Sequence, residues 1–437
     1  GDSMKKESIW IKDMEIPQFE PLRGDWKADV LVIGGGMAGV LCAWRLAQAG
    51  ADCILAEARR IGGGVTQNTT AKITCQHGLI YNRLIQRLGL EKARLYLAAN
   101  RAALEEYRAL CQRIDCDFET KDSVVYSRRD RRRIEKELEA LAKLGAEARF
   151  SAELPLPFSI AGAAVFPGQA QFHPLKFLAA LAPNLRIFEG TKVRQLAPGR
   201  AETPGGVVQA EHIVVATHFP ILNKQGGYFL KMYQSRSYEL ALEGGPDVGG
   251  MYVDENPQGL SFRNAGNFLL LGGDGRRVGK QSPGWTGLEE AARAFYPEAA
   301  PAYRWAAQDC MTLDGAPYIG RYSSRAAGLY VATGFNKWGM TSSMAAAMTL
   351  ADLVLGREAP FAPAFDPSRS IFHRQLAVNA WEAVSSLLRP GPRCPHMGCA
   401  LQYNRQERSW DCPCHGSRFA EDGALLDNPA TDDKKGM

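Results

Sequence analysis

The chain has 437 residues, of which 46% are hydrophobic and 23% are charged, and its formal net charge is +5. This length supports two to three domains, and the ordinary charge balance indicates neither a nucleic-acid partner nor an anionic membrane. No apolar run of about eighteen residues occurs, so we expect no transmembrane segment. The N-terminus lacks the apolar core of a signal peptide, and we therefore expect a cytoplasmic protein.

The first predicted elements form a βαβ unit. An irregular arm, residues 1–26, precedes a continuous apolar strand at 29–33. A glycine-rich turn and a helix follow, and a second strand at 52–56 ends at Glu57. A loop rich in Gly and Thr occupies residues 61–78.

The middle of the chain alternates between helical and strand patterns. We expect helices at 79–115, 128–145, 174–182 (starting after His173), 285–308 and 340–355. Strands are predicted at 185–188, 212–216 and 328–332, with several antiparallel strands within 228–275. A helix at 370–388, a linker at 389–392 and hairpins at 400–411 and 418–427 complete the chain.

The first glycine-rich turn has the spacing of a dinucleotide-binding loop. Gly34, Gly36 and Gly39 fit G-x-G-x-x-G between a strand and a helix, and Glu57 ends the next strand. Such glycines allow a tight turn, close approach of a pyrophosphate and packing of helix on strand, while the acidic residue binds ribose hydroxyls. The motif alone does not decide between FAD and NAD. We find no second fingerprint, which a pyridine-nucleotide-dependent flavoprotein usually carries.

Residues 27–366 resemble the FAD-dependent oxidoreductases of the D-amino-acid-oxidase superfamily. The resemblance rests on this fingerprint, the loop Gly62–Lys72, and the later segments 213–217, 314–320 and 329–340. It implies FAD as the cofactor. The cofactor-binding residues expected from the motif and the resemblance are Gly34, Gly36, Met37, Ala38, Gly39, Glu57, Thr70, Ala71, Lys72, Val193, Thr217, Gly334, Trp338, Gly339 and Met340.

Two short boxes near the C-terminus carry metal-ligand residues. Cys394 and His396 form C-x-H, and Cys412 and His415 form C-x-x-H. Two thiolates on one iron and two imidazoles on the other make a Rieske [2Fe-2S] centre. Zinc is the alternative, but zinc fingers group their cysteines and their histidines, whereas each box here mixes them.

The two boxes also resemble those of cytochrome bc-type Rieske proteins. That resemblance implies a disulfide between Cys399 and Cys414, with free thiols as the alternative. Ser417 fits the hydroxyl that donates to a bridging sulfide, but Phe419 replaces a tyrosine donor. With one donor fewer, we expect a potential below the upper part of the range of about −150 to +300 mV.

The predicted fold class is α/β, a Rossmann-like FAD-binding domain with a mixed α+β substrate domain and a small all-β Rieske segment. We assign residues 27–80, 155–220 and 311–366 to the FAD-binding domain, 81–154 and 221–310 to the substrate domain, 367–393 to a helix and linker, and 394–437 to the Rieske segment. Because that segment is short and buries little by itself, we expect it to pack on the flavoprotein body.

The predicted function is a dehydrogenase-like oxidation of a small organic substrate, such as an amine or amino acid. Electrons then pass singly through the cluster to an unknown acceptor, and the reverse direction is equally allowed. Candidate catalytic residues are Lys72, His77 and Arg263, with Arg236 and Tyr238 in the predicted substrate sheet. The alternative is a redox sensor whose cofactors signal without turnover. A Rieske oxygenase is disfavoured because no suitable His pair for a mononuclear iron stands out among the seven histidines.

Overall fold

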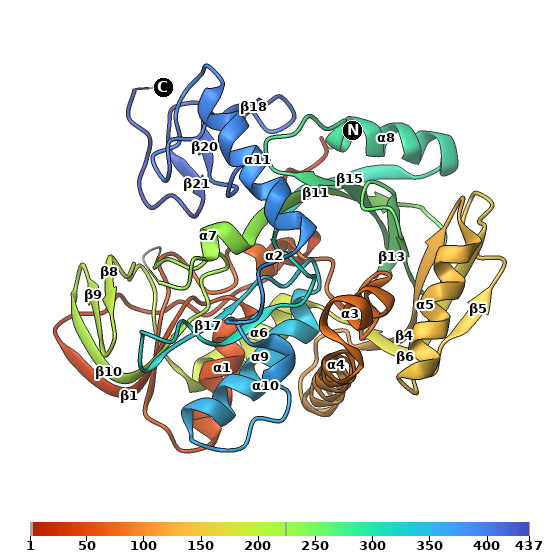
Figure 1. The fold of residues 1–437 in the computed structure, drawn as a ribbon. Helices are drawn as coiled ribbons and strands as arrows, with labels where there is room; N and C mark the ends of the chain where they lie inside the picture. Colours follow the sequence, from red (N-terminus) through yellow and green to blue (C-terminus); the bar gives the residue numbers. More distant parts are fainter. Residues whose placement is uncertain (1–2, 223–224, 437) are drawn as a thin grey trace.

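A computed structural model describes residues 3–222 and 225–436. Its first sheet has the strand order β16-β17-β10-β1-β2-β7, with β8 and β9 attached to β10 (Figure 1). The strands from β17 to β7 are parallel, and β16 is antiparallel to β17. Their bounds are β1 Trp26–Ile33, β2 Cys53–Ala56, β7 Arg186–Phe188, β8 Gln195–Ala197, β9 Arg200–Thr203, β10 Gly206–Val215, β16 Tyr318–Arg321 and β17 Leu329–Thr333.

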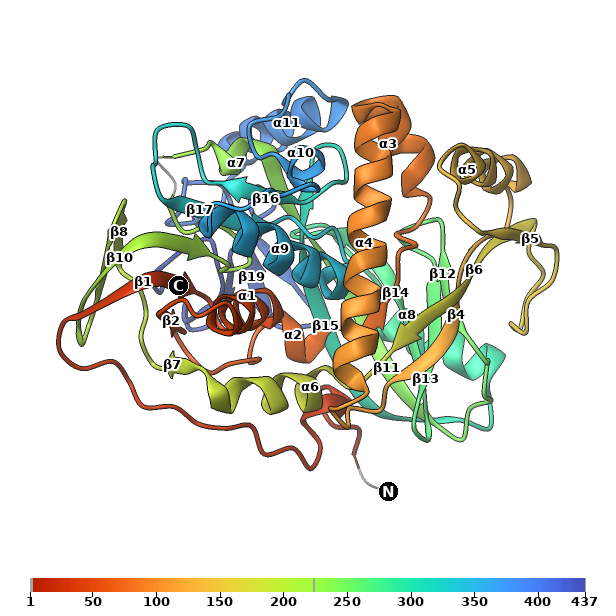
Figure 2. The ribbon, with the colours of Figure 1, turned by 90° about the horizontal axis from the view of Figure 1, so that it is seen from below.

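Helices cover this sheet because its central strands are apolar on both faces. The last four residues of β1 and all of β17 are buried. Helices α1 (Met37–Gln48) and α9 (Gly339–Val354) pack against each other beside these strands (Figure 2). The shorter helical elements near them are η1 Ile9–Ile11, α2 Val65–Asn68, α6 Pro174–Leu181, η2 Ala182–Asn184 and α10 Ala362–Phe365. As predicted, His173 caps α6: its ring accepts the Lys176 amide.

The second sheet is long and mostly antiparallel, with the order β15-β11-β14-β13-β12-β4-β6-β3 and β5 paired to β6. Its strands are β3 Lys72–Ile73, β4 Glu119–Ser127, β5 Arg149–Ser151, β6 Gly162–Gln171, β11 Met232–Glu243, β12 Met251–Asp254, β13 Leu260–Ala265, β14 Phe268–Arg277 and β15 Ala300–Thr312. The helices α3 Ile80–Leu88, α4 Leu90–Cys111, α5 Arg131–Lys143 and α8 Gly284–Phe295 belong to the same half of the molecule. The mixed α/β class expected from the sequence is thus confirmed.

Two expectations about this half need correction. The predicted helix 285–308 ends at Phe295, and residues 300–312 form β15, which pairs along the whole of β11. Alanines favoured the helix in the sequence, but the long pairing with β11 outweighs that preference. In addition, β6 belongs to the second sheet, although residues 155–220 were assigned to the FAD-binding domain. Most residues of β6 are buried, and a strand with so few exposed positions is easily taken for one of the parallel sheet.

The C-terminal segment is a four-stranded antiparallel sheet in the order β18-β19-β20-β21. Its strands, β18 Gln402–Asn404, β19 Ser409–Asp411, β20 Arg418–Ala420 and β21 Leu425–Asp427, form the two predicted hairpins. Helix α11 (Arg374–Leu388) connects it to the body, and the segment lies over α7 (Tyr228–Lys231) and one end of β11 (Figure 1). The expectation that it packs on the flavoprotein body is met.

Helix α11 turns its polar side inward. Asn379, Glu382 and Ser386 are buried, while Trp381 is 69% and Leu388 81% exposed. The buried groups are paired with the body: Asn379 Oδ1 accepts from Arg277 at 2.9 Å, and Glu382 binds Lys280. Polar contacts therefore hold the helix in place, and its apolar side faces outward. Over the described ranges, no helix is both long and apolar enough to cross a membrane.

Candidate functional site

A large cavity of about 1860 Å³ lies between the two sheets and reaches the C-terminal segment. The N-termini of α1 and α9 both open into it, through Gly36–Ala38 and Gly339–Met340. Unpaired N–H groups and the positive ends of the helix dipoles favour an anionic ligand there. The volume exceeds the roughly 300–1,000 Å³ of ordinary small-molecule pockets, so it can hold a dinucleotide together with a substrate.

The glycine spacing has a direct steric basis in this structure. Gly34 has φ +112°, and a Cβ there would lie 2.2 Å from the Ala216 carbonyl oxygen. A Cβ on Gly39 would lie 1.8 Å from the Gly34 carbonyl oxygen, so α1 can approach β1 only without that side chain. Both glycines are therefore required for the turn that presents the N-terminus of α1.

Glu57 lies at the end of β2, inside the cavity, as the motif requires. Its carboxylate accepts the Gly35 amide at 3.1 Å and the Arg59 amide, while burial raises its pKa. The first turn of α1 has one more partner that the sequence did not reveal. The Thr66 hydroxyl accepts the Met37 amide at 3.0 Å, which leaves the other N–H groups of this turn for a ligand.

The predicted cofactor residues gather around this cavity. All of them line it except Gly39, Ala71 and Gly334, which lie just behind the lining. Ala71, Asn336 and Lys337 adopt the left-handed backbone conformation although none is glycine. Such conformations are costly and cluster at functional sites, where the surrounding structure holds them.

Three charged side chains form a buried cluster at one wall, and the sequence named only two of them. Lys72 and Glu239 both line the cavity, and Arg263 lies behind them. Burial lowers the pKa of Lys72 to about 8 and raises that of Glu239 to about 8, although each charge partly offsets the effect on the other. One oxygen of Glu239 is buried without a hydrogen-bond partner. Gly272 faces Glu239 across the sheet and leaves the room that this carboxylate fills.

Arg263 and His77 both bind groups of the protein itself, and of the two only His77 is among the residues that line the cavity. Arg263 donates to the carbonyls of Thr70 at 2.6 Å and Ala71 at 3.2 Å, and it does not line the cavity. It holds the loop before Lys72 and is not a free carboxylate clamp. His77 contacts the Tyr96 hydroxyl and the Thr74 carbonyl with its two nitrogens, and burial lowers its pKa to about 3.

The His77 ring also has a structural partner in the late glycine loop. It stacks on Trp338 with ring centroids 5.1 Å apart and an interplanar angle of 10°. Trp338 is the N-cap residue of α9 and lines the cavity. A neutral ring with both nitrogens engaged is poorly suited to proton transfer, so His77 fixes the position of Trp338.

The predicted iron ligands form two pairs in the C-terminal segment, one of thiols and one of imidazole rings. The Cys394 and Cys412 thiols are hydrogen-bonded to each other, and this bond lowers the pKa of Cys394 to about 7. The His396 and His415 rings lie 5.1 Å apart and are almost perpendicular. Both ring nitrogens of His396 and Nδ1 of His415 are buried without partners. Orphaned imidazole nitrogens beside a thiol pair are a donor set that fits a [2Fe-2S] cluster.

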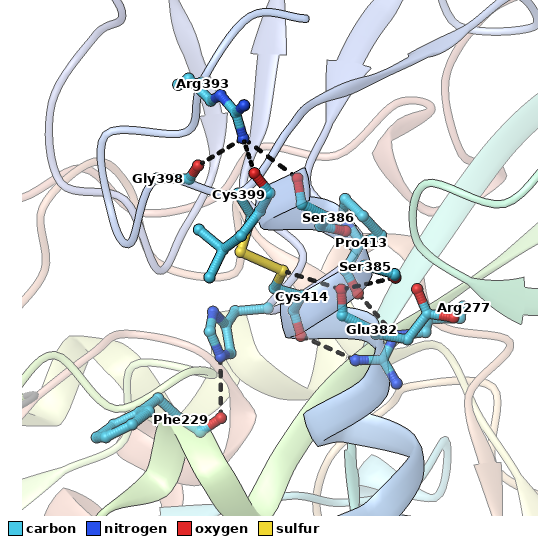
Figure 3. Close-up of a disulfide and its surroundings, with 12 residues drawn as sticks. Phe229, Arg277, Glu382, Ser385, Ser386, Arg393, Gly398, Cys399, Pro413 and Cys414 are labelled. Carbon is cyan, nitrogen blue, oxygen red and sulfur yellow. Dashed lines mark hydrogen bonds between the residues drawn. A yellow bond between two sulfur atoms is a disulfide. The ribbon is translucent and has the colours of Figure 1, made fainter. Parts of the chain in front are cut away.

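A disulfide joins Cys399 to Cys414 and connects the two ligand loops (Figure 3). The sulfurs of Cys399, Cys412 and Cys414 lie within 4.8 Å of one another. Only Cys412 has a free thiol in this group, because the other two sulfurs are bonded to each other. The pairing is the one that the resemblance to cytochrome bc-type boxes implies.

Amide side chains of the second sheet hold the second ligand loop. Gln234 Nε2 donates to the His415 carbonyl at 2.7 Å, and Gln308 Nε2 donates to the Gly416 carbonyl at 2.8 Å. His415 Nε2 is 2.9 Å from the Phe229 carbonyl, a contact also visible near the disulfide in Figure 3. The body therefore binds Nε2 of His415, and Nδ1 is left for the iron.

A buried ion pair makes a second connection between the segment and the sheet. Glu407, in the turn between β18 and β19, forms a bidentate pair with Arg236 and accepts from Tyr238. Burial alone would raise the pKa of Glu407, but Arg236 and Arg418 lower it to about 2. Arg236 and Tyr238 thus bind the C-terminal segment, and Arg236 also lines the cavity.

Comparison with known proteins identifies both parts of the chain. The family profile described as FAD dependent oxidoreductase matches residues 29–353, and the Rieske [2Fe-2S] domain profile matches residues 371–435. The chain belongs to the FAD dependent oxidoreductase family. The oxidoreductase carries FAD and a Rieske [2Fe-2S] cluster. The Rieske match thus favours the iron–sulfur cluster over the zinc alternative.

One relative shares both parts. The Rieske 2Fe-2S iron-sulfur protein YhfW of Bacillus subtilis (strain 168) is 33% identical over 495 aligned positions, which cover 97% of the oxidoreductase and 96% of YhfW. Gamma-glutamylputrescine oxidoreductase of Escherichia coli (strain K12) is 24% identical and covers 77% of the chain, with 86% of its own length aligned.

A solved structure supports the fold. Glycine oxidase from Geobacillus kaustophilus has a TM-score of 0.66 at 23% identity, covering 79% of the oxidoreductase and all of that chain.

Glu239, Glu407 and Thr66 were missed in the sequence for different reasons. Glu239 did leave a signal, because it is a lone charge in the apolar strand of residues 238–242. A charge at such a position needs a buried partner or a ligand. Glu407 and Thr66 left none, because an acidic turn residue and a loop threonine are ordinary on a surface.

Proposed function

We propose that the oxidoreductase oxidises the C–N bond of a small amine or amino acid and passes the electrons singly through its Rieske cluster to a one-electron acceptor. FAD, when bound, supplies the hydride-accepting chemistry. The residues named from the glycine motif and the resemblance would hold it, with the pyrophosphate at α1 and Glu57 at the ribose. The names of gamma-glutamylputrescine oxidoreductase and glycine oxidase support an amine or amino acid as the substrate class.

The observation that carries this proposal is the Glu239 carboxylate in the cavity wall. One of its oxygens is buried and unpartnered, so a bound ammonium group would supply the missing hydrogen-bond donor. The charge of nearby Lys72 lowers the pKa of Glu239, burial raises it, and both groups have a pKa of about 8. A carboxylate with a pKa of about 8 can take the proton of a substrate ammonium as the pH rises through that value, and the amine must be neutral before its C–N bond is oxidised.

We assign the remaining predicted catalytic residues to support. Arg263 positions the backbone of residues 70 and 71, and its charge raises the proton affinity of neither Lys72 nor Glu239. His77 fixes Trp338 against the cavity. Neither group requires contact with the substrate in this assignment.

The four predicted ligands, Cys394, His396, Cys412 and His415, would hold the cluster. A direct structural link joins this site to the cavity. Thr217 and His218 line the cavity, and the next residue, Phe219, places its ring centroid 6.2 Å from that of His415. Three consecutive residues thus connect the cavity lining to the ring of one predicted iron ligand, which supports electron passage between the two sites.

The test is anaerobic rapid mixing of the holoenzyme with a panel of amines, amino acids and hydroxy acids. We expect an amine to bleach the flavin first and the cluster afterwards, the latter seen by electron paramagnetic resonance. Glu239→Gln should lower kcat/KM for that amine by about 10²- to 10⁴-fold, the usual contribution of a general base. Glu243→Gln is the matched control, because Glu243 is on the same strand but exposed.

Two outcomes would contradict the proposal. Reduction by hydroxy acids and by no amine would remove the amine assignment. Reduction by no member of the panel, with both cofactors present, would favour the alternative of a redox sensor.

A further inference from the structure

The end of the Rieske segment lies along the FAD cavity as well as beside the cluster. Residues 425–431, here called the 425–431 strap, line the same cavity as the glycine-rich loop and Glu57. The strap contains β21 and the turn after it, on the side of the C-terminal sheet that faces the body (Figure 1). A segment remote in sequence therefore forms part of the wall of the dinucleotide site.

Four hydrogen bonds attach the strap to the rim of that site. Asn428 Nδ2 donates to the carbonyls of Thr217 at 3.1 Å and Phe219 at 3.3 Å. Arg59 Nη2 donates to the Leu425 carbonyl at 3.4 Å, and Lys192 Nζ donates to the Thr431 carbonyl. Arg59 follows the ribose-binding Glu57 by two positions, and Lys192 precedes Val193, the residue expected at the adenine. The strap thus covers the adenosine half of the site.

The same strap is attached to the cluster loops. Gln234 Nε2 donates both to the Asn428 carbonyl, at 3.0 Å, and to the His415 carbonyl. The Ala430 amide donates to Ser417 Oγ at 3.0 Å, and the Ser417 hydroxyl is hydrogen-bonded to Cys394. Displacing the strap from the FAD site would therefore disturb one histidine loop and one cysteine ligand.

We propose that the FAD site is composite, with the 425–431 strap of the Rieske segment as its outer wall, so that FAD and the cluster strengthen each other's binding. The linkage is reciprocal by thermodynamic necessity, because any factor by which the cluster raises FAD affinity applies equally to the effect of FAD on cluster affinity. Couplings of this kind are typically about 5- to 150-fold. This inference concerns cofactor retention and does not depend on the identity of the substrate.

The first experiment measures the FAD dissociation constant by flavin fluorescence in full-length protein that retains its cluster. Asn428→Ala removes the two hydrogen bonds to the loop after β10, and we expect about 10-fold weaker FAD binding. Asp432→Asn is the matched control, because Asp432 is exposed and lies just beyond the strap. Equal affinities in wild type and Asn428→Ala, with cluster content equal by electron paramagnetic resonance, would overturn the proposal.

The second experiment measures the coupling in the wild-type protein, so misfolding of a variant cannot affect the result. Iron release to a chelator is timed in the wild-type protein with FAD bound and after FAD has been removed. We expect release at least about 5-fold faster without FAD, the lower end of ordinary couplings. Equal rates would show that the sites are independent. Neither result bears on whether an amine is the substrate, so failure here and failure of the proposed function are distinguishable.

Discussion

Replacing Glu407 with Gln should separate the contribution of the buried ion pair from the rest of the contact between the Rieske segment and the body. The Glu407 side chain is only 9% exposed, and it faces both Arg236 and Arg418. Its pKa is depressed from 4.5 to about 2. At about 1.4 kcal/mol for each pH unit, the folded state gains about 3 kcal/mol from the ionised carboxylate.

The pH dependence gives this prediction its sign. Because the folded-state pKa lies below the unfolded-state value, the stabilisation is fully present above pH 4.5 and is lost as the pH falls toward 2. Urea unfolding of wild type and Glu407→Gln should differ by about 3 kcal/mol at pH 7, and the difference should shrink below pH 4.5.

The control is Glu421→Gln in the same segment. Glu421 pairs with Arg408 on the surface, and we expect no measurable change on its replacement. A difference between wild type and Glu407→Gln that is absent at pH 7, or that persists unchanged at pH 3, would refute the reasoning.

Three further predictions concern the two cofactor sites. Gly39→Ala should abolish FAD binding because its Cβ would overlap a main-chain oxygen, and flavin content after purification checks this. Turnover of the amine substrate should rise with pH through about 8 as the proton is lost from the buried pair, and Lys72→Arg should change that profile; a flat profile in wild type would argue against the proton acceptor. Phe419→Tyr should raise the cluster potential in a redox titration by restoring a donor, and a lowered potential would count against this.

The parts of the fold with local signals were predictable from the sequence. Gly34, Gly36 and Gly39 specify their turn through contacts with adjacent strand and helix residues, and the cluster boxes are short enough to be recognised by spacing. The second sheet was harder, because β15 carries helix-favouring alanines and acquires its strand conformation only by pairing with β11. Propensity gives no information about such a partner.

The composite character of the site was beyond sequence reasoning. Asn428 reaches the carbonyl of Thr217, which is 211 positions away, through an amide that any turn could carry. Arg236 was a candidate for binding a substrate carboxylate, and only the fold shows that the carboxylate it binds is that of Glu407. Contacts between two domains depend on how the domains pack against each other, and the sequence pattern within one domain does not determine that packing.

The outward apolar side of α11 has a practical consequence for biochemical work on this protein. Each Å² of apolar surface left in water costs about 25 cal/mol, and concentrated protein can recover this cost by self-association through the Trp381 and Leu388 side chains. Since Asn379, Glu382 and Ser386 make the inward contacts, the two exposed residues can be replaced with polar ones without opening the core. A Trp381→Gln, Leu388→Gln variant should therefore remain dispersed at the concentrations that spectroscopy and crystallisation need.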